Sequence, residues 1–415
     1  MSTTGTPDGP RSGAGSPGRP ADAPGQAFPD GFLWGTATAA HQVEGGNWNN
    51  DWWAWEHTPG SGCAEPSGDA CDHWHHWPDD LRLLADLGFG TYRFSLEWSR
   101  IEPEPGEFSR VALDHYLAVC AGCRELGIEP IVTFHHFTSP RWVAAAGGWT
   151  EPATADHFAR FCARAAAHLG DAVHTACTLN EPNVVATMGY LSGVFPPGER
   201  DPDRRRLANQ VLADAHRKAT AAIKEAIGAP VGLTLAMADD QAVPGGEAAL
   251  ADHVRGWEAP FLEAARGDDF IGVQTYTRHR FGPEGMLDPE PGVPLTTMGY
   301  EFWPEALGAT IRRAAEATGA PVLVTENGVA TDDDTQRVEF VRRALGSVLD
   351  CLADGVDVRG YTYWSLLDNF EWAFGYRPRF GLVAVDRVTQ VRTPKPSAAW
   401  LGRVARANRL PELGT

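Results

Sequence analysis

Two glutamates in similar contexts are the residues best suited to carry chemistry. Glu181 lies in "TLNEP" at 178–182 and Glu326 lies in "VTENG" at 324–328, each after a short apolar run. Two carboxylates that face one sugar ring can cleave a glycosidic bond, because one donates a proton to the departing oxygen while the other stays ionised beside the anomeric carbon. The alternative is that both are solvated loop acids, of which a chain with 54 Asp and Glu residues has many.

Further polar side chains follow apolar runs elsewhere in the chain. Amides and acids dominate this set, which comprises Gln42, Glu44, Arg93, Glu97, His135, His136, Asn180, Gln274, Tyr276, Asn327, Asp368, Asn369 and Glu371. Arg93 is a suitable counter-ion to keep Glu326 charged, and Tyr276 could donate a hydrogen bond to it. The set contains neither a thiolate triad nor a phosphate-binding loop.

The apolar runs themselves predict the scaffold that brings these residues together. Eight β-rich runs alternate with segments of helical spacing, such as 78–88, 112–127 and 154–170, and the runs span residues 31–40, 90–98, 128–137, 173–180, 230–237, 269–276, 321–327 and 358–368. Eight alternations indicate a single (β/α)8 barrel, whose chemistry lies at the C-terminal ends of the strands. The runner-up, a doubly wound open sheet, would be expected to show a G-x-G-x-x-G turn after its first strand, and "WGTATAAHQVEGG" lacks one.

Composition narrows the possible partners. The chain of 415 residues has a net charge of −19, which disfavours nucleic acid and anionic membranes and suits a small neutral or cationic molecule. Residues 1–27 are rich in Gly, Pro and Ser without an apolar run, so we expect a disordered tail followed by one catalytic domain over 28–410. Seven scattered cysteines do not resemble a disulfide framework, and we expect a cytoplasmic protein without a membrane span. The oligomeric state does not follow from the sequence.

Three smaller signals have structural explanations. The histidines of "DHWHHW" lack complementary zinc ligands elsewhere, and "CAGC" at 120–123 lies mid-helix, away from the exposed helix start that redox chemistry uses. The acids of "ATDDDT" at 330–335 lack the glycine and terminal glutamate of a calcium loop, so we expect a helix N-cap. We therefore predict no metal and no cofactor.

Five motifs in register resemble the retaining β-glycosidases of glycoside hydrolase family 1, the β-glucosidase family. They are "FLWGTATAAHQVEGG", "YRFSLEWSRI", "TLNEP", "VTENG" and "YWSLLDNFEW" followed by "RFGL", and the resemblance runs from Phe28 to about Trp400. The family resemblance implies a double displacement on a β-linked sugar, most often glucose, with the two carboxylates about 5 Å apart.

The resemblance also implies a role for individual residues. Glu326 matches the family nucleophile, Glu181 matches the general acid and base, and Arg93 and Tyr276 match the residues that flank the nucleophile. The residues that match sugar-binding positions are Asn180 at the 2-hydroxyl, Gln42, His136 and Glu371 at the other glycone hydroxyls, and Trp364 and Trp372 at the aromatic platform.

Two departures from the family pattern bear on activity. Gln274 replaces the usual asparagine and is expected to alter the support around Tyr276, and Phe137 replaces a tryptophan that follows the histidine in many members.

Two alternatives stay open. A 6-phospho-β-glycosidase would carry Ser-x-x-Lys-x-Tyr after the eighth strand, where this chain has Glu371, whose charge would repel a phosphate. A sugar-binding barrel with weakened catalysis is the other alternative.

Overall fold

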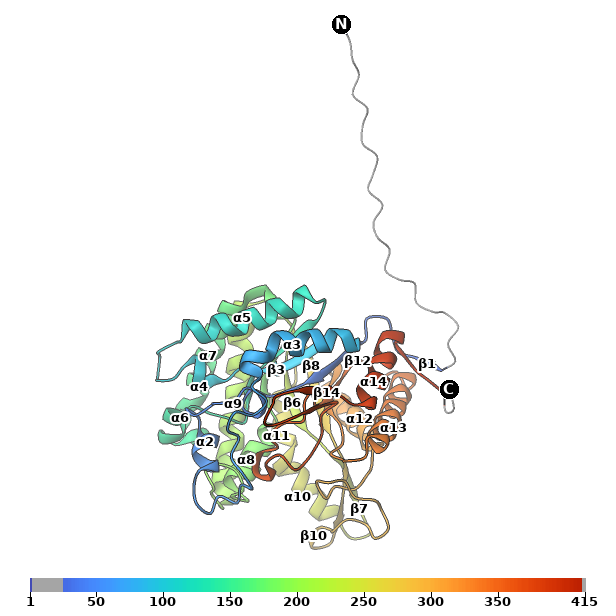
Figure 1. The fold of residues 1–415 in the computed structure, drawn as a ribbon. Helices are drawn as coiled ribbons and strands as arrows, with labels where there is room; N and C mark the ends of the chain where they lie inside the picture. The colour runs from blue at the N-terminus through green and yellow to red at the C-terminus, as the bar shows by residue number, and fades with distance from the viewer. Residues whose placement is uncertain (2–24, 413–415) are drawn as a thin grey trace.

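Eight parallel strands close into a barrel at the centre of the molecule (Figure 1). The computed structural model describes residue 1 and residues 25–412. In order around the barrel, the strands are β2 (Leu33–Ala37), β3 (Thr91–Ser95), β4 (Glu129–His136), β5 (Thr175–Asn180), β6 (Val231–Ala236), β8 (Phe270–Thr275), β11 (Val322–Asn327) and β12 (Val358–Trp364). Because β12 pairs with β2, the sheet has no free edge, and the open-sheet alternative is wrong. The predicted barrel is confirmed, with one strand inside each predicted run.

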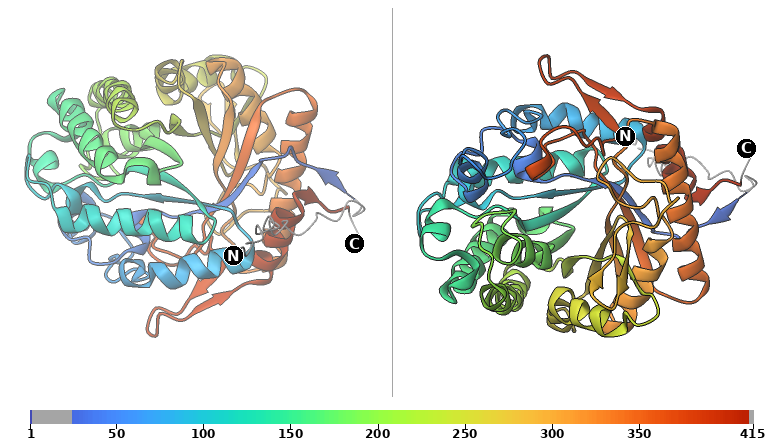
Figure 2. Two further views of the ribbon diagram at one scale, coloured as in Figure 1. Left: turned by 90° about the horizontal axis from the view of Figure 1, so that it is seen from above. Right: turned by 90° about the horizontal axis from the view of Figure 1, so that it is seen from below.

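A ring of helices surrounds the barrel, as the two end-on views show (Figure 2). The helices that follow the eight strands are α3 (His73–Leu87), α5 (Arg110–Glu125), α7 (Ala153–Leu169), α9 (Pro202–Ala226), α11 (Ala259–Ala264), α12 (Ala306–Thr318), α13 (Asp334–Ala353) and α14 (Pro396–Ala407). Capping residues determine where these helices begin and end. The Ser109 side chain caps the start of α5, and Gly88 ends α3 with a φ of 98°, which a residue with a Cβ rarely adopts.

Shorter elements lie mainly in the connections between strands and helices. The helices are α1 (Ala40–Val43), α2 (Asp51–Glu56), α4 (Trp98–Ile101), α6 (Arg141–Ala145), α8 (Pro182–Tyr190) and α10 (Glu247–Trp257), and the strands are β7 (Asp239–Ala242), β9 (Arg278–Gly282), β10 (Gly285–Met286), β13 (Val383–Val385) and β14 (Arg392–Pro394). The connections that carry α2, α8 and β10 lie together on the lower side of Figure 1. This side holds the C-terminal ends of the barrel strands.

Apolar side chains fill the barrel on both sides of the sheet. Ile131, Cys177, Phe270 and Leu323 come from four different strands and form one buried cluster, so the barrel interior is packed below the site. The outer faces of the strands belong to the large core shared with the helices, as Val322 and Val324 of β11 show. Since both faces are covered, the strands appear in the sequence as continuous apolar runs.

The predicted boundary of the N-terminal tail needs a correction. Most of the segment 1–27 lies outside the described residues, but Gln26–Ala27 form strand β1 and pair with β15 (Arg409–Leu410). The ordered domain therefore begins before Phe28, because backbone pairing with the C-terminal strand extends it. Within residue 1 and residues 25–412, no helix is long and apolar enough to cross a membrane.

Candidate active site

A register shift turns the Glu326 side chain into the barrel. Leu323 of β11 belongs to the cluster inside the barrel, while Val324 packs outward against the helices. Strict alternation would place Glu326 on the outer face with Val324. The pairing of β11 with β8 shifts instead, so that Val324 pairs with Val273 and Glu326 pairs with Gln274, leaving Thr325 as an extra residue. The bulge therefore presents the carboxylate to the barrel mouth.

Glu181 is positioned by the junction between β5 and α8. It adopts a left-handed conformation with φ 45° and ψ 57°, which few residues with a Cβ adopt, and it precedes Pro182 at the first position of α8. Strain of this kind persists where the surrounding structure imposes it, as it often does at functional sites. Its amide donates to the Thr234 carbonyl at 2.9 Å, which ties the junction to the neighbouring strand β6.

Three donors surround the Glu326 carboxylate. Arg93 Nη1 lies 2.5 Å from Oε1, Gln274 Nε2 lies 2.9 Å from the same oxygen, and the Tyr276 hydroxyl lies 2.6 Å from Oε2. All of these groups donate hydrogen bonds, so they stabilise the ionised carboxylate. Burial raises the pKa of Glu326, and Arg93 and Tyr276 oppose that effect.

The Glu181 carboxyl lacks such support. Its residue is 9% exposed, and no described residue donates a hydrogen bond to the side chain. Burial raises the pKa of Glu181 well above its usual range, and the nearby charges of Glu326 and Glu371 raise it further. The two acids therefore differ in their environment, in the way that separates a proton donor from an ionised partner.

A buried network links Glu326 to the amides of Asn180 and Gln274. Asn180 Oδ1 accepts hydrogen bonds from Arg93 at 2.6 Å and from Gln274 at 2.8 Å, and its Nδ2 lies 3.2 Å from His136 Nε2. Gln274 thus bridges Asn180 and Glu326. The expectation that Gln274 alters the support around Tyr276 stays a prediction, and in this structure Gln274 contacts Glu326, the carboxylate to which Tyr276 also donates.

The remaining predicted residues gather beside this network. Trp364 Nε1 donates to Glu371 Oε1 at 3.3 Å, and Gln42 Nε2 donates to the Phe370 carbonyl at 2.7 Å. Burial raises the pKa of Glu371 well above its usual range. Gln42 Oε1 and His136 Nδ1 are buried and have no hydrogen-bond partner among the described residues.

Stacked rings form one wall of the site. The His136 ring lies 5.7 Å from Trp364 and 6.0 Å from Trp372, in both cases nearly parallel. Phe137 packs on Trp372 at 4.9 Å and on Phe195 at 5.6 Å, so it serves as a packing residue without an N–H donor. The sequence-predicted residues are therefore brought together, while His135 turns away and contacts Ser139 at 3.2 Å.

Two residues near the site were not predicted from the sequence. Thr234 Oγ1 lies 3.3 Å from both Arg93 and Asn180, yet it sits within an apolar strand run that gives no sign of a polar role. Tyr300 is 37% exposed over the whole residue, but burial of its phenol group, together with the charges of Glu181 and Glu371, raises its pKa to about 12. It lies in the connection between β10 and α12, which does not follow one of the apolar strand runs directly.

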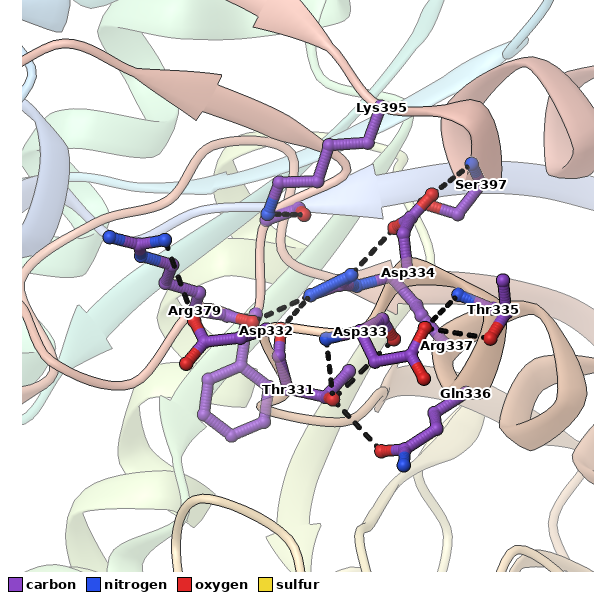
Figure 3. Close-up of polar contacts among 12 residues, drawn as sticks. Thr331, Asp332, Asp333, Asp334, Thr335, Gln336, Arg337, Arg379, Lys395 and Ser397 are labelled. Carbon is purple, nitrogen blue, oxygen red and sulfur yellow. Dashed lines mark hydrogen bonds and ion pairs between the residues drawn. The ribbon is translucent and has the colours of Figure 1, made fainter.

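The smaller signals have the structural roles expected of them. His73 begins α3 and contacts Asp80 at 2.8 Å, and burial raises the pKa of Cys120 to about 12. The acids of the segment 332–334 have separate partners, as Figure 3 shows: Asp332 pairs with Arg379, Asp333 caps α13, and Asp334 binds Arg337 and Ser397. Within residues 25–412, no cluster of histidine, cysteine and acidic side chains is arranged to hold a metal ion.

Comparison with known proteins gives a consistent result. β-Glucosidase A of Thermotoga maritima is 34% identical over 92% of this chain and 98% of its own length. A bifunctional β-D-glucosidase/β-D-fucosidase of Bifidobacterium breve is also 34% identical, over 91% of this chain and 97% of its own. Among solved structures, β-glycosidase BGL167 is 50% identical with a TM-score of 0.87, and covers 94% of this chain and 99% of its own. A β-glucosidase from T. maritima has been solved in complex with glucoimidazole, and that structure has a TM-score of 0.87 at 32% identity over 92% of this chain and 100% of its own.

The family model described as glycosyl hydrolase family 1 matches residues 25–261 and 268–410. The barrel, the paired glutamates and these relatives lead to the same conclusion. This chain belongs to glycosyl hydrolase family 1.

Proposed function

We propose that this protein is a retaining β-glucosidase that removes terminal β-D-glucosyl residues with Glu326 as nucleophile and Glu181 as acid and base. The observation that carries the proposal is the difference between the two carboxylates. Glu326 accepts hydrogen bonds from Arg93, Gln274 and Tyr276, whereas Glu181 is buried and accepts none from the described residues. A carboxylate that accepts hydrogen bonds is stabilised in its ionised form and suits attack on carbon. A buried carboxyl that accepts none is stabilised in its protonated form and suits proton donation.

In the first step, a Glu326 oxygen forms a bond to the anomeric carbon while the bond to the leaving oxygen breaks. The Glu181 carboxyl gives its proton to that oxygen, so the aglycone departs neutral. In the second step, the ionised Glu181 removes a proton from water, and the water oxygen displaces Glu326 and restores its carboxylate. A separation of roughly 5–5.5 Å between the carboxyl groups belongs to this mechanism. No cofactor is required.

The glycone is held by groups that the protein leaves partly unpaired. Gln42 Oε1 and His136 Nδ1 have no partner among the described residues, and Glu371 is held by Trp364. We assign these polar atoms to sugar hydroxyls and Asn180 to the 2-hydroxyl, where hydrogen bonds strengthen in the transition state. The indoles of Trp364 and Trp372 offer apolar faces to the C–H side of the ring. Glucoimidazole, which the T. maritima relative binds, is consistent with a glucose-shaped site.

Neither alternative gains support from the site. A phosphate at the 6-position would meet Glu371, which is buried near Glu181 and Glu326 in an acidic environment. A barrel without catalysis would not need three donors on Glu326.

We also propose a cytoplasmic location, which suits seven free cysteines, six of them buried.

The direct test replaces each carboxylate and supplies a substitute nucleophile. Glu326→Gly should abolish turnover of nitrophenyl β-glucoside, and azide should restore it with α-glucosyl azide as product, because azide attacks from the vacated side. Glu181→Ala should give β-glucosyl azide, because azide then attacks the α-linked glycosyl-enzyme. Turnover by Glu326→Gly without azide would overturn the assignment, and so would the opposite pairing of anomers.

A further inference from the structure

A second cavity lies between the loop after β2 and the N-terminal turn of α5. Its volume is about 260 Å³, and none of its lining residues belongs to the site of Glu181 and Glu326. Aromatic, amide and small side chains dominate the lining, which includes Asn47, Trp48, Trp74 and Arg100. Ligand pockets commonly span roughly 300–1,000 Å³, so this cavity suits a single ring.

Trp48 presents an uncovered indole at this cavity. It is 63% exposed and is the only exposed tryptophan among the described residues. Trp74 offers a contrast on the same cavity, because the Arg100 guanidinium lies 4.1 Å from its ring and His115 stacks on it at 3.6 Å. Within the described part of the chain, no ring or cation packs on Trp48 in this way. An exposed indole offers an apolar face on which the C–H side of a sugar ring can stack.

Asn47 adds an acceptor that lacks a partner. The residue is 3% exposed, its Nδ2 donates to Glu44 Oε2 at 3.3 Å, and its Oδ1 has no hydrogen bond within residues 25–412. A buried amide oxygen without a partner costs free energy, and a ligand hydroxyl that donates to it removes that cost.

The charges at the cavity are already matched. Arg100 Nε lies 3.0 Å from Glu44 Oε2 and its Nη2 donates to the Gly45 carbonyl at 2.5 Å. Glu44 accepts a further hydrogen bond from Tyr116 at 2.7 Å. Because the guanidinium and the carboxylate neutralise each other, the cavity favours a neutral ligand with hydroxyl groups over an ion.

We propose that this cavity is a second carbohydrate site, which binds one pyranose ring of a neutral β-glycoside outside the catalytic site. The ring stacks on Trp48, and one of its hydroxyls donates to Asn47 Oδ1. The choice of a sugar as the ligand rests on the proposed function, since a glycosidase meets neutral glycosides as substrates and products.

Fluorine NMR of the protein labelled with 5-fluorotryptophan tests this site directly. The Trp48 resonance is assigned by its loss in Trp48→Phe, and S-linked thiocellobiose, which resists hydrolysis, is the titrated probe. We expect a saturable shift of the Trp48 resonance, separate from shifts at the catalytic tryptophans. Asn47→Ala should weaken the binding seen at Trp48 by about three- to tenfold, while nitrophenyl β-glucoside turnover stays unchanged. Val388→Ala, a remote change at a residue that is 92% exposed, is the matched control and should change neither.

The outcomes separate the two proposals. A Trp48 resonance that does not shift, in a protein that turns over nitrophenyl β-glucoside, overturns the second site and leaves the proposed function standing. A Trp48 shift with the same affinity in Asn47→Ala also overturns the site, since binding would then involve only the exposed ring. Absence of turnover with an intact Trp48 response would instead refute the proposed function.

Discussion

Removal of the Tyr276 hydroxyl should move the acidic limb of the pH–activity profile upward. This hydroxyl donates to Glu326 Oε2 at 2.6 Å and lowers the pKa of that carboxyl against the effect of burial. A hydrogen bond to a charged group contributes about 1.5–3 kcal/mol, and one pKa unit corresponds to about 1.36 kcal/mol. Tyr276→Phe should therefore raise the pKa of Glu326 by roughly one to two units.

The direction of the shift in the pH–activity profile follows from the role of Glu326 as the ionised partner. A raised pKa keeps Glu326 protonated to higher pH, so activity is lost earlier as the pH falls. The measurement is kcat/KM for nitrophenyl β-glucoside across pH, where the acidic limb reports the group that must be ionised and the alkaline limb reports the group that must be protonated. Tyr376→Phe is the control, because its hydroxyl donates to the Ser67 carbonyl and does not contact Glu326. An acidic limb that stays in place or moves downward in Tyr276→Phe would mean that the Tyr276 hydroxyl does not lower the pKa of Glu326.

Two further variants test the acid and the scaffold. Glu181→Gln removes the proton donor and should lower kcat/KM for cellobiose by about 10²–10⁴-fold while affecting dinitrophenyl β-glucoside far less; equal losses on both substrates would contradict the assigned role. Leu323→Ala opens the buried cluster inside the barrel, where the residue is 4% exposed, and should lower the free energy of unfolding in urea by about 2–5 kcal/mol. A loss below about 0.5 kcal/mol, the size of an ordinary surface change, would mean that the cluster does not support the barrel.

The scaffold was predictable because its signal is repeated. Each barrel strand is buried on both faces and appears as an apolar run, and eight such runs alternate with helical segments. The two ends of the chain carry no such signal. The pairing of Gln26–Ala27 with Arg409–Leu410 joins residues far apart in sequence through backbone hydrogen bonds, so composition alone placed the boundary too late.

The site residues that lie in short motifs were predictable from the sequence. The site contacts that depend on strand register were not. Glu181 and Glu326 lie in short polar motifs that can be recognised in the sequence. The glycine that ends the second motif, Gly328, cannot carry a side chain, since an added Cβ would lie 2.1 Å from the Trp364 carbonyl oxygen. The contact of Gln274 with Glu326 depends on the bulge at Thr325, which alternation does not reveal. Tyr300 lies in the connection between β10 and α12, and its proximity to Glu181 and Glu371 is seen only in the folded structure.

Trapping of the glycosyl-enzyme identifies the nucleophile directly. A 2-deoxy-2-fluoro-β-glucosyl fluoride has a good leaving group, and its fluorine slows hydrolysis of the intermediate, so the sugar should accumulate on the nucleophile. Peptide mapping by mass spectrometry then identifies the labelled residue. We expect one fluoroglucosyl group on Glu326 and none on Glu181. A label on Glu181, or an active enzyme that forms no covalent adduct, would overturn the assignment of Glu326 as the nucleophile.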